Sequence, residues 1–356
     1  MPELSVCIIS KNEEENIEKC LRAITPLQSE IILTDTGSSD RTVEIAKKYT
    51  KNIFHFDWCD DFSAARNYCA ARASNDWILF IDCDEYLVLA DILRLNEIIN
   101  EHPLEIGMVN RISPYPGDEA QQSRHDFVAR LYNRNLYTYK GTIQETIEPI
   151  NEELVPMDYD SPKYFEIPLT FYHAGFETIN NRRKKAERDL TMLQDILRTE
   201  GPSAYTYYQL GKCYVAMKDP ALAAHYYYSG ISLNPNPVHT YVHDMVESYG
   251  FCLLELKQYD KALSLEQYYD NFSSRADYVY LMGLIYMNNA RYDEAIAQFK
   301  KAIGIKNYSI EGVNTYAPRY NIGLIYESLG KPDEAISFYK QCGSYAPAIK
   351  RIAALS

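Results

Sequence analysis

The sequence predicts a protein in two parts: an α/β domain with a Rossmann-like sheet, followed by an all-α repeat domain. Two observations predict this division. In the first half of the chain, short apolar runs alternate with helix-like segments, which is typical of a mostly parallel sheet. In the second half, a glycine and an alanine recur at a fixed interval, and 22 of the 32 tyrosines lie in the last 156 residues. The two halves are therefore built differently.

The composition is that of an ordinary globular protein and excludes several classes. The 356 residues are 46% hydrophobic and 24% charged, and at roughly 100–200 residues per domain they allow two or three domains. The net charge of −13 argues against general binding of nucleic-acid phosphates. No apolar stretch approaches the ~20 residues that span a bilayer, and the N-terminus lacks the basic region of a secretory signal. The eight cysteines form no CxxC pair, so we expect a reduced, cytoplasmic protein with buried thiols.

Three short apolar runs in the first half are predicted to be buried strands: residues 5–10, 31–33 and 77–81. Helical spacing of apolar residues follows the first run, and a helix over 41–49, capped by Asp40, is expected after the second. The carboxyl ends of parallel strands meet at one edge of a sheet, so the polar residues after these runs should converge there.

Asp82 and Asp84 carry the chemistry predicted for this edge. Two carboxylates one residue apart, just past a buried strand, can hold a hard divalent cation, and that cation can bridge a diphosphate. A turn with two solvated acids is the alternative. The upstream loop that starts at Asp35, rich in Asp, Gly and Ser, favours the binding site.

The second half is predicted to hold four tetratricopeptide repeats. Glycine and alanine stand 12 residues apart in four places: Gly211/Ala223, Gly250/Ala262, Gly283/Ala295 and Gly323/Ala335. Successive units are 39, 33 and 40 residues apart, against about 34 in a standard repeat, so additional loop residues are expected before the second and fourth units. The second unit is degenerate. We expect domains at 1–178 and 203–356, joined by a linker helix at 179–202; an unrelated helical bundle is the alternative for the second.

Four segments of the first half resemble the family 2 glycosyltransferases, which have a GT-A fold: SVCIISKNEEENIEKCL, ILTDTGSSDRTVEIA, DDFSAARN and WILFIDCDEYL. The resemblance covers residues 3–175 and implies transfer of a sugar from a nucleotide diphosphate donor, such as a UDP-sugar, with Mg²⁺ or Mn²⁺ as cofactor. With its repeat tail, the chain is similar to a bacterial subgroup that includes the sublancin-type peptide S-glycosyltransferases and some flagellin glycosyltransferases.

The resemblance also implies roles for the polar residues at the strand ends. Ser10, Asn12, Glu13 and Asp35 would line the base and the ribose of the donor. Asp82 would hold hydroxyls of the ribose or the sugar.

Three further residues would bind the diphosphate and the metal ion. Arg66, in the FSAARN segment, would contact the donor diphosphate, unless it is a surface arginine of a helix. Asp84 would ligate the metal ion. His173 would be a further metal ligand, and a structural histidine at a strand end is the alternative.

Glu145 is the candidate general base. Inverting transfer needs a carboxylate that takes the acceptor proton while the nucleophile attacks C1 of the sugar. Glu145 lies in a segment where relatives have a histidine at the preceding position and this chain has Gln144. A charged residue in the first turn of a helix is the alternative.

The predicted function is inverting, metal-dependent transfer of a sugar to a peptide or protein side chain docked by the repeats. Transfer to a saccharide or lipid-linked acceptor is one alternative, and a regulatory scaffold with secondary transferase activity is another. The stretch 113–126 is expected to be a mobile loop near the acceptor. A last helix at 347–355, apolar at Ile349, Ile352 and Leu355, predicts a homodimer through the final repeats.

Overall fold

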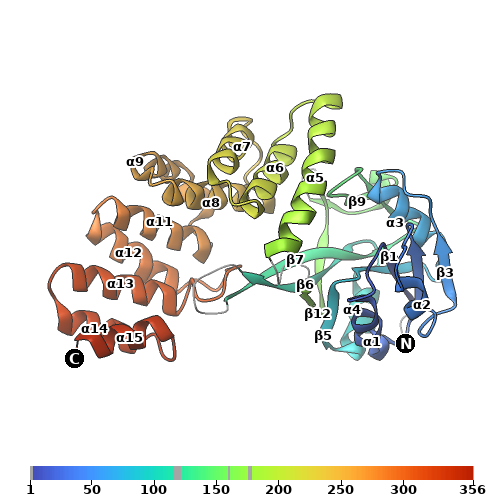
Figure 1. Ribbon diagram of the computed structural model, residues 1–356, viewed down its shortest axis with the longest axis horizontal. Helices are drawn as coiled ribbons and strands as arrows, with labels where there is room; N and C mark the ends of the chain where they lie inside the picture. Colours follow the sequence, from blue (N-terminus) through green and yellow to red (C-terminus); the bar gives the residue numbers. More distant parts are fainter. Residues whose placement is uncertain (1–2, 116–121, 159–160, 175–178, 356) are drawn as a thin grey trace. The chain divides into compact units, whose positions relative to one another are not determined.

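The computed structural model describes residues 3–115, 122–158, 161–174 and 179–355 (Figure 1). The chain divides into two compact units. The first comprises Met1–Ser113 and Asp126–Thr178, and the second comprises Pro114–His125 and Ile179–Ser356. Of the residues before 179, the second unit therefore takes in the end of β6 and the start of β7, among those that the structure describes.

The first unit is built on an eight-stranded mixed sheet with the order β3-β2-β1-β4-β7-β6-β12-β5. Strand β1 runs parallel to β2 and β4, and β2 runs parallel to β3. Beyond β4 the directions mix: β7 is antiparallel to β4, β12 is parallel to β6, and β5 is antiparallel to β12. The strands are β1 (Leu4–Ser10), β2 (Glu30–Asp35), β3 (Asn52–His55), β4 (Trp77–Asp82), β5 (Glu85–Ala90), β6 (Ile106–Tyr115), β7 (Gln122–Asn133) and β12 (Tyr164–His173). The three predicted strands are confirmed as β1, β2 and β4.

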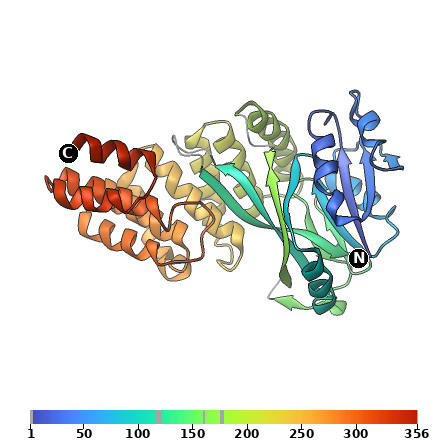
Figure 2. The ribbon, with the colours of Figure 1, turned by 90° about the horizontal axis from the view of Figure 1, so that it is seen from below.

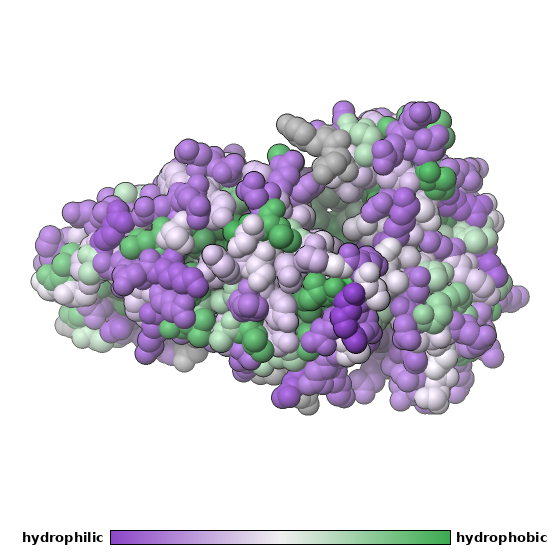
Figure 3. All heavy atoms as spheres, turned by 90° about the horizontal axis from the view of Figure 1, so that it is seen from above, coloured by the Kyte–Doolittle hydropathy of each residue, from purple (hydrophilic) through white to green (hydrophobic). Residues whose placement is uncertain are grey.

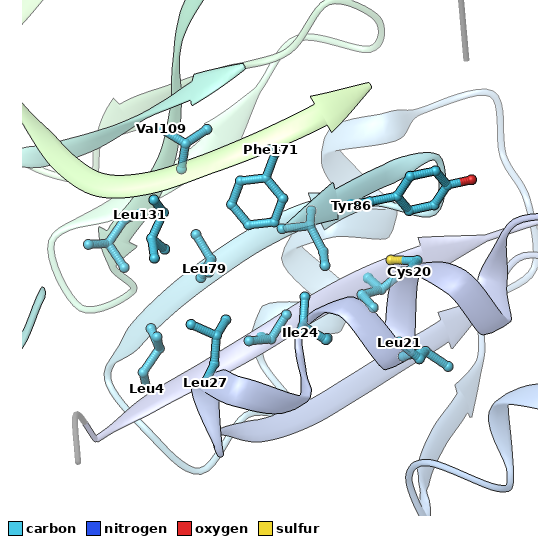
Figure 4. Packing of buried hydrophobic residues seen from close by; sticks show 14 of the residues in the cluster. Leu4, Cys20, Leu21, Ile24, Leu27, Leu79, Tyr86, Val109, Leu131 and Phe171 are labelled. Atoms are coloured by element: carbon cyan, nitrogen blue, oxygen red, sulfur yellow. The ribbon is translucent and has the colours of Figure 1, made fainter. Parts of the chain in front are cut away.

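Helices cover both faces of this sheet because β1 is apolar on both sides. Val6 and Ile8 point into one core, which includes Leu21 of α1, whereas Cys7 points into the opposite core with Cys69 of α3. Figure 4 shows the first core closing between β1 and α1. The helices of this unit are α1 (Ile17–Ala23), α2 (Thr42–Ala46), α3 (Phe62–Ala70) and α4 (Ile92–Glu101).

Two local expectations need correction. Helix α2 begins at Thr42 and is shorter than predicted, although the Asp40 carboxylate does accept hydrogen bonds from the Thr42 backbone N–H at 2.9 Å and hydroxyl at 2.5 Å. The stretch 113–126 is not a loop where it is described, since β6 runs to Tyr115 and β7 begins at Gln122. Residues 116–121 lie outside the described residues. Two small sheets complete the unit: β8 (Tyr137–Lys140) with β9 (Thr146–Pro149), and β10 (Met157–Asp158) with β11 (Ser161–Pro162).

The second unit is a succession of helical hairpins, which Figure 2 shows in chain order. After α5 (Ile179–Thr199) come α6 (Ala204–Ala216), α7 (Pro220–Ser232), α8 (Thr240–Glu255), α9 (Tyr259–Ala262), α10 (Tyr269–Phe272), α11 (Ala276–Asn288), α12 (Tyr292–Ile303), α13 (Tyr316–Ser328), α14 (Pro332–Lys340) and α15 (Ala346–Leu355). The pairs α6–α7, α11–α12 and α13–α14 are regular repeats. In the second repeat, α8 is followed by a broken helix, α9, a 3₁₀ turn and α10, which confirms that this unit is degenerate.

The recurring glycine is required where the two helices of a repeat meet. A Cβ on Gly283 would lie 2.5 Å from the Phe299 ring, and a Cβ on Gly323 would lie 2.4 Å from the Tyr339 ring. Such distances are far below van der Waals contact, so a larger residue would push the second helix away. The aromatic ring of the second helix fills the notch that the missing side chain leaves.

The surface carries hydrophobic residues in small groups among hydrophilic ones on the face shown in Figure 3. Among the described helices, none has both the length and the apolar character needed to cross a membrane. All eight cysteines are free thiols, and seven are buried while Cys59 is exposed, which confirms the prediction of unpaired, mostly buried cysteines.

Candidate active site

The loops after β1 and β2 are joined by hydrogen bonds into one structure. The Asn12 backbone N–H donates to the Ser38 hydroxyl at 2.9 Å, and the Asn12 side-chain oxygen accepts from the Ser39 N–H at 2.8 Å. The Glu13 N–H donates to the Thr42 hydroxyl at 2.7 Å. Asn12 adopts a left-handed φ of 55°, a conformation that asparagine tolerates better than most residues. These contacts bring the predicted residues Asn12 and Glu13 beside the Asp35 loop.

Ser10 and Asp35 are register neighbours at the carboxyl ends of β1 and β2. One carboxylate oxygen of Asp35, Oδ2, accepts from the backbone N–H of Gly37 at 3.1 Å and of Ser38 at 3.0 Å. The other oxygen, Oδ1, and the Ser10 hydroxyl are buried and have no hydrogen-bond partner within the described part of the chain. An open pocket of about 500 Å³ borders Asp35 and His55. Buried polar atoms without a protein partner can bind a ligand or an ordered water molecule.

Asp82 ends β4 in a network with two buried arginines. Arg66 of α3 donates to Oδ1 at 3.0 Å, and Arg130 of β7 donates to Oδ2 at 2.7 Å. Burial opposes ionisation of Asp82, but attraction by Arg130 and Arg66 outweighs it and holds the pKa of this carboxyl well below its usual range. Asp82 is therefore ionised at neutral pH. Each of its oxygens has a second lone pair that can accept from a hydroxyl, and the side chain is 32% exposed.

Glu145 is bound by the same Arg66, whose Nε donates to its Oε1. The Arg66 guanidinium lies 4.6 Å from the Phe80 ring and 5.3 Å from the Tyr139 ring, and its Nη1 is buried without a partner among the described residues. Burial opposes the charge of Arg66, but Glu145 and Asp82 outweigh it and raise the pKa of the guanidinium. The alternative that Arg66 is a surface arginine is therefore wrong, because only 6% of it is exposed.

Glu145 does not lie in a helix. Gln144, directly before it, has a left-handed φ of 53°, and β9 begins directly after it at Thr146. The helix-first-turn interpretation of Glu145 is therefore wrong.

Two members of the network were not among the predicted site residues. Arg130 also donates to Oε1 of Glu85 at 2.7 Å, and Oε2 of Glu85 accepts from the Asp82 backbone N–H at 3.2 Å. Glu85 is 1% exposed, so Arg130 and Glu85 together hold the turn that carries Asp82 and Asp84. The sequence did carry a signal, since Glu85 directly follows the acidic turn. The pairing with Arg130 was hidden because 45 residues separate the two, and the sequence does not show that β7 lies beside β4.

Asp84 and His173 form a separate pair. Oδ1 of Asp84 lies 3.4 Å from Nε2 of His173, and both side chains are buried. The Ala174 backbone N–H donates to the Asp84 carbonyl at 2.9 Å, so the end of β12 is tied to the acidic turn. The two predicted metal ligands are therefore neighbours.

The Asp84 carboxylate would suit a hard divalent cation that is shared with a diphosphate, and the His173 imidazole would suit a transition-metal ion in the same place. Mg²⁺ in nucleotide sites is held by one or two carboxylates together with substrate phosphates and water. In the described ranges, no group of three or more His, Cys, Asp or Glu side chains could hold a metal alone. Asp84 and His173 would therefore supply the protein ligands, and phosphate oxygens would supply others.

The parallel strand order β3-β2-β1-β4, with an acidic turn at its carboxyl edge, defines the first unit as a GT-A-like domain. The sequence profile of glycosyl transferase family 2 matches residues 5–153, and tetratricopeptide repeat profiles match residues 204–237 and 275–342. The chain thus carries a family 2 glycosyltransferase domain followed by tetratricopeptide repeats, and the predicted resemblance is confirmed. The profiles match the regular repeats and leave the degenerate one unmatched.

Several curated proteins are similar to this chain. A TPR repeat-containing protein of Synechococcus elongatus is 28% identical over 80% of this chain and 69% of its own length. The SPbeta prophage-derived glycosyltransferase SunS of Bacillus subtilis is 29% identical over 56% of this chain and 46% of its own length. An uncharacterized glycosyltransferase of Rickettsia typhi is 29% identical over 49% of this chain and 61% of its own length. The chain therefore spans only about half to two thirds of these relatives.

A crystal structure of MamA aligns with 49% of this chain at a TM-score of 0.39 and 21% identity. This similarity is too low to inform the fold or the function.

Proposed function

We propose that this protein transfers a sugar from a nucleoside diphosphate sugar to a side chain of a peptide or protein, with inversion at the anomeric carbon and with Mg²⁺ or Mn²⁺. The observation that carries the proposal is the Asp84–His173 pair beside the buried Asp82–Arg66–Glu145 network, at one edge of a family 2 domain. The free thiols suit a reducing compartment, so we place the reaction in the cytoplasm.

The donor base would bind at Asp35. Its buried Oδ1 is an acceptor without a partner in the described residues, and a base that presents an N–H there, as uracil does, would complete it. The Ser10 hydroxyl beside it can donate to a carbonyl or ribose oxygen. This chemistry suits a donor whose base has a ring N–H, such as a UDP-sugar.

The diphosphate would bind between the acidic turn and Arg66. Asp84 and His173 would hold the cation, which would supply positive charge to balance the charge that develops on the leaving diphosphate. Nη1 of Arg66 is a further buried donor that has no partner in the described ranges. Asp82 keeps Arg66 in place and can accept from a sugar or ribose hydroxyl.

Glu145 would act as the general base. The acceptor nucleophile attacks C1 of the sugar, the bond from C1 to the diphosphate oxygen breaks, and the acceptor proton passes to the Glu145 carboxylate. Arg66 holds Oε1, so Oε2 is the oxygen that takes the proton. A single displacement of this kind inverts the anomeric carbon.

The polypeptide acceptor is supported by the second unit, which already holds one extended segment of its own chain by backbone hydrogen bonds at Ser123 and His125. One alternative is a saccharide or lipid-linked acceptor, for which the transfer chemistry would be the same. The other alternative is a regulatory scaffold, which would need no enzymatic turnover.

The test is a turnover assay on the full-length protein. Purified protein is incubated with a panel of nucleotide sugars, with and without Mn²⁺, and release of the nucleoside diphosphate is measured alongside thermal shift. We expect Mn²⁺-dependent hydrolysis of one UDP-sugar and a matching rise in melting temperature. Absence of turnover with every donor, in a protein that still binds UDP, would favour the scaffold.

A further inference from the structure

Strand β6 carries two polar residues whose hydrogen-bonding capacity is not used within the first unit. The Nε atom of Arg111 and the hydroxyl of Ser113 are buried, and neither has a hydrogen-bond partner in the described part of the chain. Ser113 is only 7% exposed. A buried donor without a protein partner is unfavourable unless a ligand or an ordered water molecule accepts its hydrogen bond. Both residues can therefore take part in a binding site.

The two residues lie beside the candidate active site, within the same sheet. Arg111 of β6 is opposite Phe171 of β12, and these two strands are parallel. Ser113 and His173 each follow two residues further along their strands. His173 is the neighbour of Asp84 in the pair that would hold the metal ion. Arg111 and Ser113 therefore border the Asp84–His173 pair on the β6 side.

The order of the strands indicates which part of the donor comes near β6. Across the sheet the order is β2, β1, β4, β7, β6 and β12. The base would bind at Asp35, which ends β2, and the diphosphate would bind at the end of β4, near Asp82 and Arg66. In a nucleotide sugar, the sugar follows the diphosphate. A donor that continues in the same direction past β4 therefore brings its sugar toward Arg111 and Ser113.

Two carboxylates hold the guanidinium group of Arg111 in place. Its Nη1 lies 3.8 Å from Oε1 of Glu85, and its Nη2 donates to Oδ2 of Asp126 at 3.4 Å. Glu85 is itself held by Arg130, which donates to the same Oε1 at 2.7 Å. The guanidinium is planar and rigid, so the two carboxylates also fix the direction of the Nε–H bond. Arg111 therefore presents a donor of defined position to an oxygen atom of a ligand.

The charges around Arg111 favour a neutral ligand. In the described ranges, three guanidinium groups share four carboxylates through ion pairs: Arg66, Arg111 and Arg130 with Asp82, Glu85, Asp126 and Glu145. This cluster has no excess of positive charge, so a carboxylate on the ligand would be desolvated without a counter-charge of its own. Hydroxyl oxygens can accept from Arg111 and Ser113 without adding a charge. The donor groups on β6 therefore suit the hydroxyl groups of a neutral sugar.

We propose that Arg111 and Ser113 form a subsite that binds hydroxyl groups of the transferred sugar, and that this subsite selects a neutral sugar over one that carries a carboxylate. The inference rests on the proposed function, and it names the class of sugar and two residues that recognise it. Both residues act in binding, and neither exchanges a proton with the substrate.

The test is calorimetric titration of the full-length protein with UDP, UDP-glucose and UDP-glucuronate, with Mn²⁺ present. UDP lacks the sugar, and the two sugar nucleotides differ only at C6, which is a CH₂OH group in one and a carboxylate in the other. We expect R111Q to weaken the binding of UDP-glucose about tenfold or more, because a hydrogen bond from a charged group is lost, and S113A to weaken it about twofold or more. Both variants should bind UDP as tightly as the wild type, and the wild type should prefer UDP-glucose to UDP-glucuronate.

Asn110 provides a matched control on the same strand. It directly precedes Arg111, so its side chain points to the opposite face of β6, where it donates to the Thr170 hydroxyl at 3.5 Å. N110A should bind all three ligands as the wild type does. D126N tests the charge argument, because it removes one of the four carboxylates. It should reduce the preference for UDP-glucose over UDP-glucuronate about threefold or more, and an unchanged preference would contradict the selection by charge.

The outcomes separate the sugar subsite from the transfer reaction. Unchanged binding of UDP-glucose in R111Q and S113A, or an equal loss for UDP and UDP-glucose, would overturn the subsite and leave these buried groups to ordered water. If the selective loss is found but the wild type hydrolyses no donor, the proposed function fails and the subsite stands. Hydrolysis without a selective loss of binding leads to the opposite conclusion. A wild type that binds none of the three ligands would contradict both.

Discussion

Asp84 differs from Asp82 in its partners, although a single residue separates them. Asp82 is neutralised by two arginines, whereas Asp84 faces His173. We predict that Asp84→Ala lowers Mn²⁺-dependent turnover at least about 10²-fold, because metal catalysis supplies several kcal/mol. The fold should survive, which circular dichroism checks. Full turnover in the variant would show that the metal, if used, binds elsewhere.

The role of Glu145 as general base can be tested by substitution. Glu145→Gln keeps the shape of the side chain and can still accept from Arg66, so donor binding should persist. The transfer rate should fall about 10²–10⁴-fold, which is what a positioned general base supplies. Titration of UDP and a single-turnover assay separate the two quantities. A near wild-type rate would assign the proton acceptor to another group.

Glu247 gives a prediction about stability. Burial raises its pKa to about 8, despite attraction by Arg275, and Asp277 and Asp244 add to the rise. The folded pKa lies above the ordinary value of 4.5, so the folded state binds the extra proton and stability is lost as pH rises from about 4.5 to 8.

The substitution Glu247→Gln removes the titrating carboxyl and with it the loss of stability at high pH. We expect its melting temperature at pH 8 to exceed that of the wild type by about 2–4 °C or more, and the difference to vanish near pH 4. Scanning calorimetry at both pH values measures this. An equal difference at both pH values would indicate that titration of Glu247 is not the cause.

At the scale of elements, the close contact between the two helices of a repeat can be tested by a single substitution. Gly283→Ala should destabilise the array by about 1–3 kcal/mol, because its Cβ would overlap the Phe299 ring, and this exceeds the gain of roughly 1 kcal/mol in helix propensity. Gly304→Ala is the control, since its Cβ would meet only a carbonyl at 3.7 Å. The urea concentration at the midpoint of unfolding should be lower for Gly283→Ala than for Gly304→Ala. Equal midpoints would show that the Cβ at position 283 does not disturb the packing against Phe299.

Elements with a local pattern could be predicted from the sequence, and contacts between distant elements could not. Strand β4 was predicted because its apolar run is continuous, and the repeats were predicted because Gly283 and Ala295 recur with their counterparts at one interval. The Arg130–Glu85 pair could not be predicted, since it depends on which strand lies beside β4. The same holds for Arg124, whose partner is in another part of the chain.

At the scale of the whole molecule, we predict a homodimer through the last repeat. On α15, Ile349 is 52% exposed, while Ile352 and Leu355 pack partly against the core below. Light scattering at micromolar concentration should give twice the chain mass for the wild type and one chain mass for Ile349→Glu. The control Leu93→Glu alters an 80% exposed leucine of α4 and should stay dimeric. A monomeric wild type would leave the repeats without a role in self-association.

The pairing of residues 123–125, at the start of β7, with the segment around Ile310 also constrains how the protein is made. Arg124 precedes Asp244 by 120 residues, and Ser123 precedes Glu311 by 188. A ribosome that adds roughly 5–20 residues per second leaves residues 123–125 without these partners for roughly 6–40 s. During this interval an unpaired strand end is open to association with other nascent chains. The outer end of β7 is therefore completed only after Glu311 has been synthesised, 188 residues after Ser123.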